Sequence, residues 1–278
     1  MMGLLSWGTP FYLLAVYGMV RYFSKPDKEA KENQINWHPL ETVGVTVAIY
    51  FVSQLIGGAL VYLYPLARHW NQNQINNWIN SSVIAEFLLV LAVETLTVWL
   101  LVRFLKHRKA TVGTIGLQRR PQWTDLAYVL MGFVIYFILY IAIVDLAKAL
   151  VPHLDLNQQQ QLGFKDAHRL QLLPVFVSLV LLPPFVEELL VRGFLYSGLK
   201  KSLPKIWAVL LTSALFATAH LQAGSGAPLL WVAALDTFVL SLVLIYLREK
   251  TGSLWASIGL HMLKNTIAFL SLFVFHVL

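Results

Sequence analysis

Long apolar runs constrain this sequence more than any other feature. Segments of about 20 apolar residues recur along the whole chain, and a helix of that length crosses the hydrocarbon of a bilayer. We expect spans at residues 4–22, 41–64, 80–102, 126–150, 172–198, 206–221, 228–247 and 254–275. The sequence therefore predicts an all-α, polytopic membrane protein with about eight transmembrane helices.

The composition agrees with lipid as the solvent, because 58% of the residues are hydrophobic and only 13% are charged. The chain contains no cysteine, which excludes disulfides, thiolate nucleophiles and Cys-type metal sites. A net charge of +7 could indicate nucleic-acid binding. The basic residues instead lie in short clusters between the apolar runs, as expected for contacts with lipid headgroups. We therefore expect the lipid bilayer as a partner and no nucleic acid.

The loops differ strongly in basic charge. Those that follow the first, third, fifth and seventh spans hold most of the Lys and Arg residues, whereas the other loops hold only Arg68, Lys165 and Arg169. Because positively charged loops stay in the cytoplasm, both termini are predicted outside. The first span has no basic residue before it, which is unlike a cleaved signal peptide, so we expect it to remain in the protein.

The fifth span carries charges that lipid does not accept without partners. Pro183 and Pro184 precede Glu187 and Glu188, and Arg192 follows Glu188 by four residues. Glu188 and Arg192 therefore share a helix face and are predicted to form an ion pair. Glu187 lies about 100° around the helix without a local partner. Ionisable residues inside a membrane usually mark function, so Glu187 is a candidate general base.

Three more polar residues lie in later spans. His220 follows Phe216 by four residues, and Asn265 follows His261 by four. At ~1.5 Å per residue, Glu187, both histidines and Asn265 lie roughly 16 to 22 Å from their nearest basic loop. A carboxylate, two imidazoles and an amide at a shared depth could activate a water and stabilise an oxyanion.

These motifs, in this order and each on an apolar span, resemble those of the CAAX-processing and bacteriocin-processing intramembrane proteases, the CPBP or Abi family. The motifs are Glu-Glu-x-x-x-Arg, Phe-x-x-x-His and His-x-x-x-Asn, and the resemblance covers roughly residues 171–270. It implies a protease core at 125–278. Residues 1–124 are expected to form a transmembrane extension of about three helices with a basic cytoplasmic loop.

The resemblance implies an endopeptidase of the bacterial plasma membrane whose substrate is a membrane-associated peptide or protein. CAAX-type processing, bacteriocin maturation or immunity and regulated proteolysis all stay open. Glu187 would be the catalytic base and His220 would orient the water, while His261 and Asn265 would stabilise the oxyanion. Three further residues would support the site: Glu188, Arg192 and Phe216.

No cofactor is favoured, and zinc is the alternative. Glu187, Glu188, His220 and His261 could supply oxygen and nitrogen ligands. The chain has no His-Glu-x-x-His helix, the more specific zinc motif. The family itself has been described both as metalloproteases and as metal-free glutamate proteases.

Two other classes of function stay open. Buried acids and histidines also form relays in transporters, although the chain shows no inverted repeat. A non-catalytic immunity or scaffold protein could use the same fold. Asp236 and Lys264 are expected to pair between the last two spans, and the alternative is that Lys264, which borders the third motif, contacts the substrate. For Glu86 and Glu94 in the third span, a structural role or a partner contact is favoured, because no histidine lies in that span.

Overall fold

The computed structural model describes residues 17–18, 21–22, 35–151, 158, 164, 167–221 and 229–276, and no strand occurs in these parts of the chain. The helices are α2 (Pro39–Ala67), α3 (Gln72–Ser81), α4 (Val83–His107), α5 (Trp123–Leu150), α6 (Leu172–Phe176), α7 (Leu182–Glu187), α8 (Tyr196–Lys200), α9 (Lys205–Ala219), α10 (Trp231–Thr251) and α11 (Trp255–Phe269). Shorter 3-10 and π-helical turns are η1 (Gly113–Leu117), η2 (Arg169–Gln171), η3 (Val177–Leu181), η4 (Glu188–Leu195) and η5 (Leu270–Val274). The all-α prediction is confirmed.

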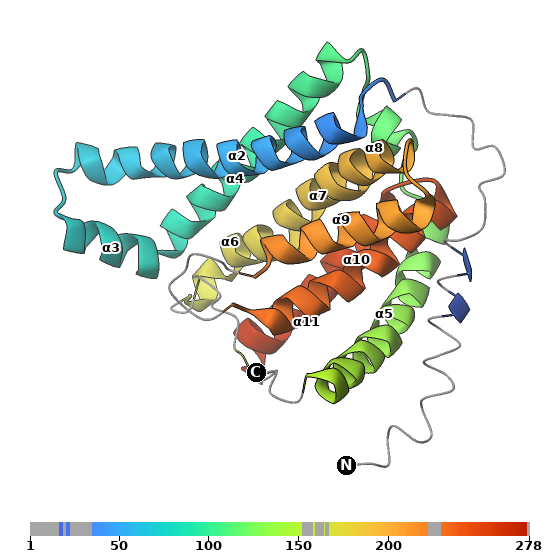
Figure 1. Ribbon diagram of the computed structural model, residues 1–278. Coiled ribbons are helices and arrows are strands. Elements are labelled where there is room, and N and C mark those ends of the chain that lie inside the picture. The colour runs from blue at the N-terminus through green and yellow to red at the C-terminus, as the bar shows by residue number, and fades with distance from the viewer. Residues whose placement is uncertain are drawn as a thin grey trace.

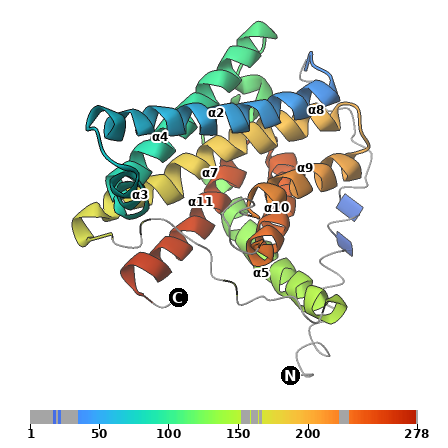
Figure 2. The same cartoon turned by 60° about the vertical axis from the view of Figure 1, so that its left-hand side comes forward.

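One long helical segment, Arg169–Lys200, lies at the centre and contains α6, α7 and α8 with the π turns between them. Figure 2 shows α2 running beside its C-terminal portion, η4 and α8, and α9, α10, α11 and α5 lie on its other side. Half of its apolar stretch is buried inside the protein, against 17% for α2 and 22% for α4. The outer helices therefore present most of their apolar surface to lipid.

Helices α2 and α4 pack against each other as an antiparallel pair at one edge of the molecule (Figure 1). Gly57 permits this close approach, because a Cβ at that position would lie 2.7 Å from Cγ2 of Val93. Small residues allow such contacts between membrane helices. Next to this point the Thr97 hydroxyl donates a hydrogen bond to Ser53 Oγ at 2.9 Å. The pair is thereby fixed in register.

Six helices of the described chain are long and apolar enough to cross a membrane. They are Pro39–Ala67, Val83–His107, Trp123–Leu150, Arg169–Lys200, Trp231–Thr251 and Trp255–Val274. Helix α9 is apolar but has only 15 residues, and the first predicted span lies almost entirely outside the described residues. The predicted count of eight spans is therefore not confirmed, although the boundaries of the described spans agree closely with the sequence prediction. Helix α3 was not predicted.

The basic loops meet at one end of the protein. Lys201 donates a hydrogen bond to the carbonyl oxygen of Ile35, which precedes α2. Lys200 and Lys205 form ion pairs with Glu249 near the end of α10, at 3.1 and 2.6 Å. Arg108 after α4 pairs with Glu41 at the start of α2. The loops after the third, fifth and seventh spans and the residues before α2 thus share one face, as the positive-inside pattern requires.

The loop after the third span also docks onto the start of α11. The carbonyl oxygen of Gly116 accepts hydrogen bonds from Leu254 N at 3.0 Å and Ser253 Oγ at 3.2 Å. Gly116 has a φ of 123°, a conformation that L side chains rarely adopt. A glycine at this position therefore lets the loop hold the start of the helix that carries His261 and Asn265.

The positive-inside pattern predicts that the basic face is cytoplasmic. Because the chain has no native cysteine, single cysteines at exposed Lys109 after α4 and exposed Asn73 in α3 report on opposite faces. We expect an impermeant maleimide added to intact cells to label Asn73→Cys, and Lys109→Cys to react only after permeabilisation. Labelling of both positions from one side contradicts this topology.

Candidate active site

The centre of the site is a fully buried ion pair within the central helix. Arg192 Nη1 donates a hydrogen bond to Glu188 Oε1 at 2.8 Å, and neither side chain is exposed. This is the pair expected from the four-residue spacing. His261 on α11 places Nδ1 3.1 Å from the same oxygen. Because a carboxylate only accepts, Nδ1 of His261 donates to Glu188 and joins α11 to the central helix.

Glu187 lies next to this network but has a different environment. Its side chain is 30% exposed, and its Oε2 atom is 3.8 Å from Nε2 of His261. The two ring nitrogens of His261 therefore face two different carboxylates, those of Glu187 and Glu188. Adjacent residues on a helix thus divide between two environments, since Glu188 is locked in the ion pair and Glu187 faces an open space.

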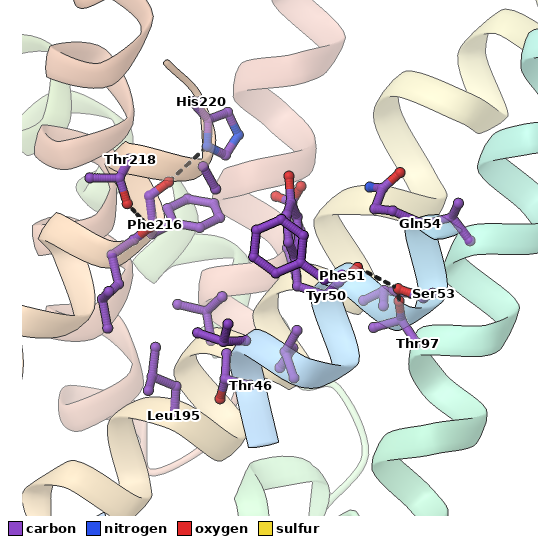
Figure 3. A pocket seen from close by; sticks show the side chains of 18 of the residues that line it. Thr46, Tyr50, Phe51, Ser53, Gln54, Thr97, Leu195, Phe216, Thr218 and His220 are labelled. Atoms are coloured by element: carbon purple, nitrogen blue, oxygen red, sulfur yellow. Dashed lines mark hydrogen bonds between the residues drawn. The ribbon is translucent and has the colours of Figure 1, made fainter. Parts of the chain in front are cut away.

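That space is a cavity of about 360 Å³ between α2, α4, the central helix and α9. Glu187, Phe216 and His220 line it, together with Tyr50 and Glu94 from α2 and α4. Figure 3 shows His220 and Phe216 on the α9 side and Tyr50 with Gln54 on the α2 side. The remainder of the lining is largely apolar, so the cavity suits an apolar chain with a few polar contacts.

His220 ends α9 and is held by its own helix. Its Nδ1 atom lies 2.9 Å from the carbonyl oxygen of Phe216 (Figure 3). Because a carbonyl oxygen accepts, Nδ1 carries the proton, which leaves the lone pair of Nε2 available as an acceptor in the neutral ring. His220 therefore has one nitrogen fixed and one free for a water or substrate.

Phe216 connects the parts of the site through its ring. The ring centroid lies 4.8 Å from that of His220 and 6.1 Å from that of His261, both edge-to-face. Cζ of Arg192 lies 4.1 Å from the same centroid, within the range of a cation–π contact. The apolar ring therefore separates the buried charges from the cavity.

Asn265 is held by a backbone carbonyl group of the central helix that two prolines leave without its usual donor. Its Nδ2 atom donates a hydrogen bond to the carbonyl oxygen of Leu179 at 2.8 Å. This carbonyl would normally accept from the residue four positions later, or five in a π turn, and these residues are Pro183 and Pro184. Proline has no backbone N–H. The paired prolines therefore free the carbonyl that fixes Asn265.

The predicted site residues thus meet, with one difference from the sequence expectation. Glu187, Phe216 and His220 line the cavity, whereas among the described residues His261 and Asn265 do not belong to its lining. His261 reaches the cavity through Glu187, and Asn265 lies one turn further along α11 with one N–H used by Leu179. The second N–H of this amide has no hydrogen-bond partner in the part of the chain that the structure describes.

Sequence reasoning missed the contribution of the N-terminal helices. For Glu94 the sequence favoured a structural role or a partner contact, but the structure places this residue on the cavity that also contains Glu187. Tyr50 and Gln54, one helical turn apart on α2, were not singled out at all. An intramembrane carboxylate was the available signal for Glu94. Glu86, eight residues earlier, faces a separate small space beside Gly58 and Tyr62.

A second polar cluster joins α11 to two neighbouring helices. Lys264 Nζ donates to Asp236 Oδ2 at 2.5 Å, which is the interhelical pair expected from the sequence. The hydroxyl of Tyr136 on α5 donates to Asp236 Oδ1. This cluster ties α5, α10 and α11 together.

The four candidate metal ligands do not fit one ion in this arrangement. Within the described ranges, no group of three or more His, Asp or Glu side chains has a geometry that could hold a metal. Glu188 Oε1 is shared by Arg192 and His261, and Nδ1 of His261 faces that oxygen. These contacts compete with metal coordination by Glu188 and by Nδ1.

The comparisons with known proteins concern the segment that carries the three motifs. Residues 169–267 match the family model described as type II CAAX prenyl endopeptidase Rce1-like, so this segment is similar to that family of endopeptidases. The resemblance identified from the three motifs is thereby confirmed. The match contains all three motifs and begins at the first residue of the central helix.

A relative in the same family is the uncharacterized protein YyaK of Bacillus subtilis (strain 168). It is 30% identical over 183 residues, which are 64% of this chain and 56% of that protein. The aligned part thus covers little more than half the length of this relative. No solved structure matches the chain at a significant level.

The buried pair leads to a prediction about stability. Arg192→Leu leaves the carboxylate of Glu188 buried without its cation, and breaking such a pair typically costs about 3–5 kcal/mol. Glu187→Gln keeps the shape of a side chain that is outside the ion pair. We expect thermal unfolding in detergent to show a large loss of stability for Arg192→Leu and a small change for Glu187→Gln. Equal destabilisation by the two changes would remove the distinction between supporting residue and base.

Proposed function

We propose that this protein is an intramembrane endopeptidase that hydrolyses a peptide bond of a membrane-associated peptide or protein. The observation that carries the proposal is Glu187, a partly exposed carboxylate on an apolar cavity, backed by a fully buried Glu188–Arg192 pair. The similarity of residues 169–267 to an endopeptidase family supports it. The location that fits is the bacterial plasma membrane, with both termini outside.

In the proposed reaction Glu187 accepts a proton from a water molecule, and the hydroxide oxygen bonds to the carbonyl carbon of the scissile amide. His220 accepts the second hydrogen of that water through Nε2, because its Nδ1 is held by Phe216. The carbonyl oxygen becomes an oxyanion. His261, when both nitrogens are protonated, and the second N–H of Asn265 are the proposed donors to it.

The cavity fits an extended peptide segment better than a folded protein. It has polar groups at Glu187, His220 and Tyr50, and apolar side chains cover most of the remaining wall. An apolar wall lets the substrate approach from the lipid without exposing its own apolar residues to water. We therefore propose that the substrate reaches the cavity while it is anchored in or against the bilayer.

Loss of the base tests the activity without knowledge of the substrate. Glu187→Gln removes the proton acceptor and preserves the shape of the side chain, so it should abolish turnover. We expect membrane-peptide fragments that are present in cells with the wild-type protein to be absent with Glu187→Gln. Glu86→Gln, on α4 but outside the cavity, is the matched control and should give the wild-type fragments. Identical fragment sets from wild type and Glu187→Gln contradict a peptidase.

A metal-free mechanism has its own consequence. The contacts of Glu188 and His261 support water activation by Glu187 and His220 without an ion. We expect purified protein to keep its peptidase activity after exhaustive chelation, with well under one metal ion per chain by elemental analysis. Stoichiometric zinc whose removal abolishes activity and whose return restores it would show a metalloprotease instead.

A further inference from the structure

The cavity contains a second carboxyl group that the proposed mechanism has not used. Glu94 is on α4, in the N-terminal part of the chain, whereas Glu187 is on the central helix. The titratable groups on the cavity are these two glutamates with Tyr50 from α2 and His220 from α9, and no Lys or Arg belongs to its described lining. Both acids therefore face the same space without a neighbouring cation on its wall.

The two carboxyl groups have different neighbours. Glu187 has Nε2 of His261 at 3.8 Å and the Glu188–Arg192 pair directly behind it. Glu94 forms no hydrogen bond or ion pair with any described residue. Two carboxyl groups that face one largely apolar cavity disfavour each other's ionisation, so the pair retains one proton. With both nitrogens of His261 protonated, as in the proposed mechanism, the imidazolium favours the charge on Glu187, and the remaining proton consequently resides on Glu94.

A neutral carboxylic acid opposite a carboxylate base is the division of roles found in enzymes that use two carboxyl groups. An amide nitrogen is a poor leaving group until it is protonated, so hydrolysis of a peptide bond needs a proton donor as well as a base. Glu94 carries such a proton on a wall of the cavity different from the wall that holds Glu187. The substrate bond can therefore lie between donor and acceptor.

We infer that Glu94 is a second catalytic residue, the general acid that protonates the leaving amine; this rests on the proposed peptidase function. Glu187 takes one proton from water as the hydroxide adds to the carbonyl carbon. When the tetrahedral intermediate collapses, the C–N bond breaks and the nitrogen takes the proton of Glu94. Glu94 is then a carboxylate and Glu187 a carboxylic acid, and proton exchange through water in the cavity restores the starting state. No oxidant, metal or other reactant is needed.

A general-acid role for Glu94 predicts that its loss affects cleavage of an amide bond more than cleavage of an ester bond. An alkoxide leaves without prior protonation far more readily than an amide nitrogen, so a depsipeptide needs the acid much less than it needs the base. The probes are a synthetic peptide carrying the bond found in the fragment comparison, and the same peptide with an ester at that bond. The full chain in lipid nanodiscs is assayed as wild type, Glu94→Gln, Glu187→Gln, Tyr50→Phe and the control Glu86→Gln.

We expect Glu94→Gln to lower kcat/KM for the amide by roughly 10² to 10⁴-fold, the usual contribution of a general acid, and for the ester by less than about tenfold. Glu187→Gln should abolish both activities, and Glu86→Gln should preserve both. Glu94→Asp, which keeps the carboxyl group, should recover part of the amide activity, and this guards against a folding defect of the Gln variant.

Three results would overturn the inference. Glu94→Gln could retain amide cleavage, or it could lose amide and ester cleavage in equal proportion, which indicates a structural role. The amide-specific loss could also appear in Tyr50→Phe rather than in Glu94→Gln, which makes the phenol the donor. If wild type cleaves neither probe, it is the proposed peptidase function that fails.

Discussion

The arrangement of the site depends on the ion pair between Glu188 and Arg192. Both side chains are fully buried, and a buried charge without its partner is strongly destabilising. The pair lies within the central helix, and its contacts with neighbouring helices, Glu188 with His261 on α11 and Arg192 with Phe216 on α9, fix the rotation of that helix. This rotation turns the adjacent Glu187 toward the cavity. The pair has no contact with the open space itself, yet it determines which of two neighbouring glutamates is available for chemistry.

Much of this could be predicted from the sequence because the membrane limits the choices. Apolar runs of sufficient length must be helices, so the boundaries of α2, α4, α5, α10 and α11 followed from hydropathy. The Glu188–Arg192 and Asp236–Lys264 pairs followed from spacing and from the cost of an unpaired charge in lipid. Helix α3 was missed because its amide-rich sequence has the composition of a loop, and its helical form depends on capping by Asn71 and Gln74.

The composition of the cavity wall could not be predicted in the same way. Depth along a helix can be counted from the sequence, but the direction a residue faces depends on packing between helices far apart in the chain. The close contact of Gly57 with Val93 and the Ser53–Thr97 hydrogen bond set the α2–α4 pair. That pair brings Tyr50, Gln54 and Glu94 to the space beside Glu187. The segment expected to be a transmembrane extension therefore forms part of the cavity, and the part that matches the endopeptidase family supplies only some of its walls.

The two prolines of the central helix have an effect that reaches beyond local helix geometry. Leu179 can offer its carbonyl oxygen to Asn265 only while neither possible backbone donor, at position 183 or position 184, carries a hydrogen. Replacing either proline introduces a backbone N–H that competes with the side-chain amide for one acceptor. A helix regularised in this way would be locally more ideal but would release Asn265 on the neighbouring helix. The missing backbone hydrogen bond in the central helix thus determines where the side chain of Asn265 on α11 is held.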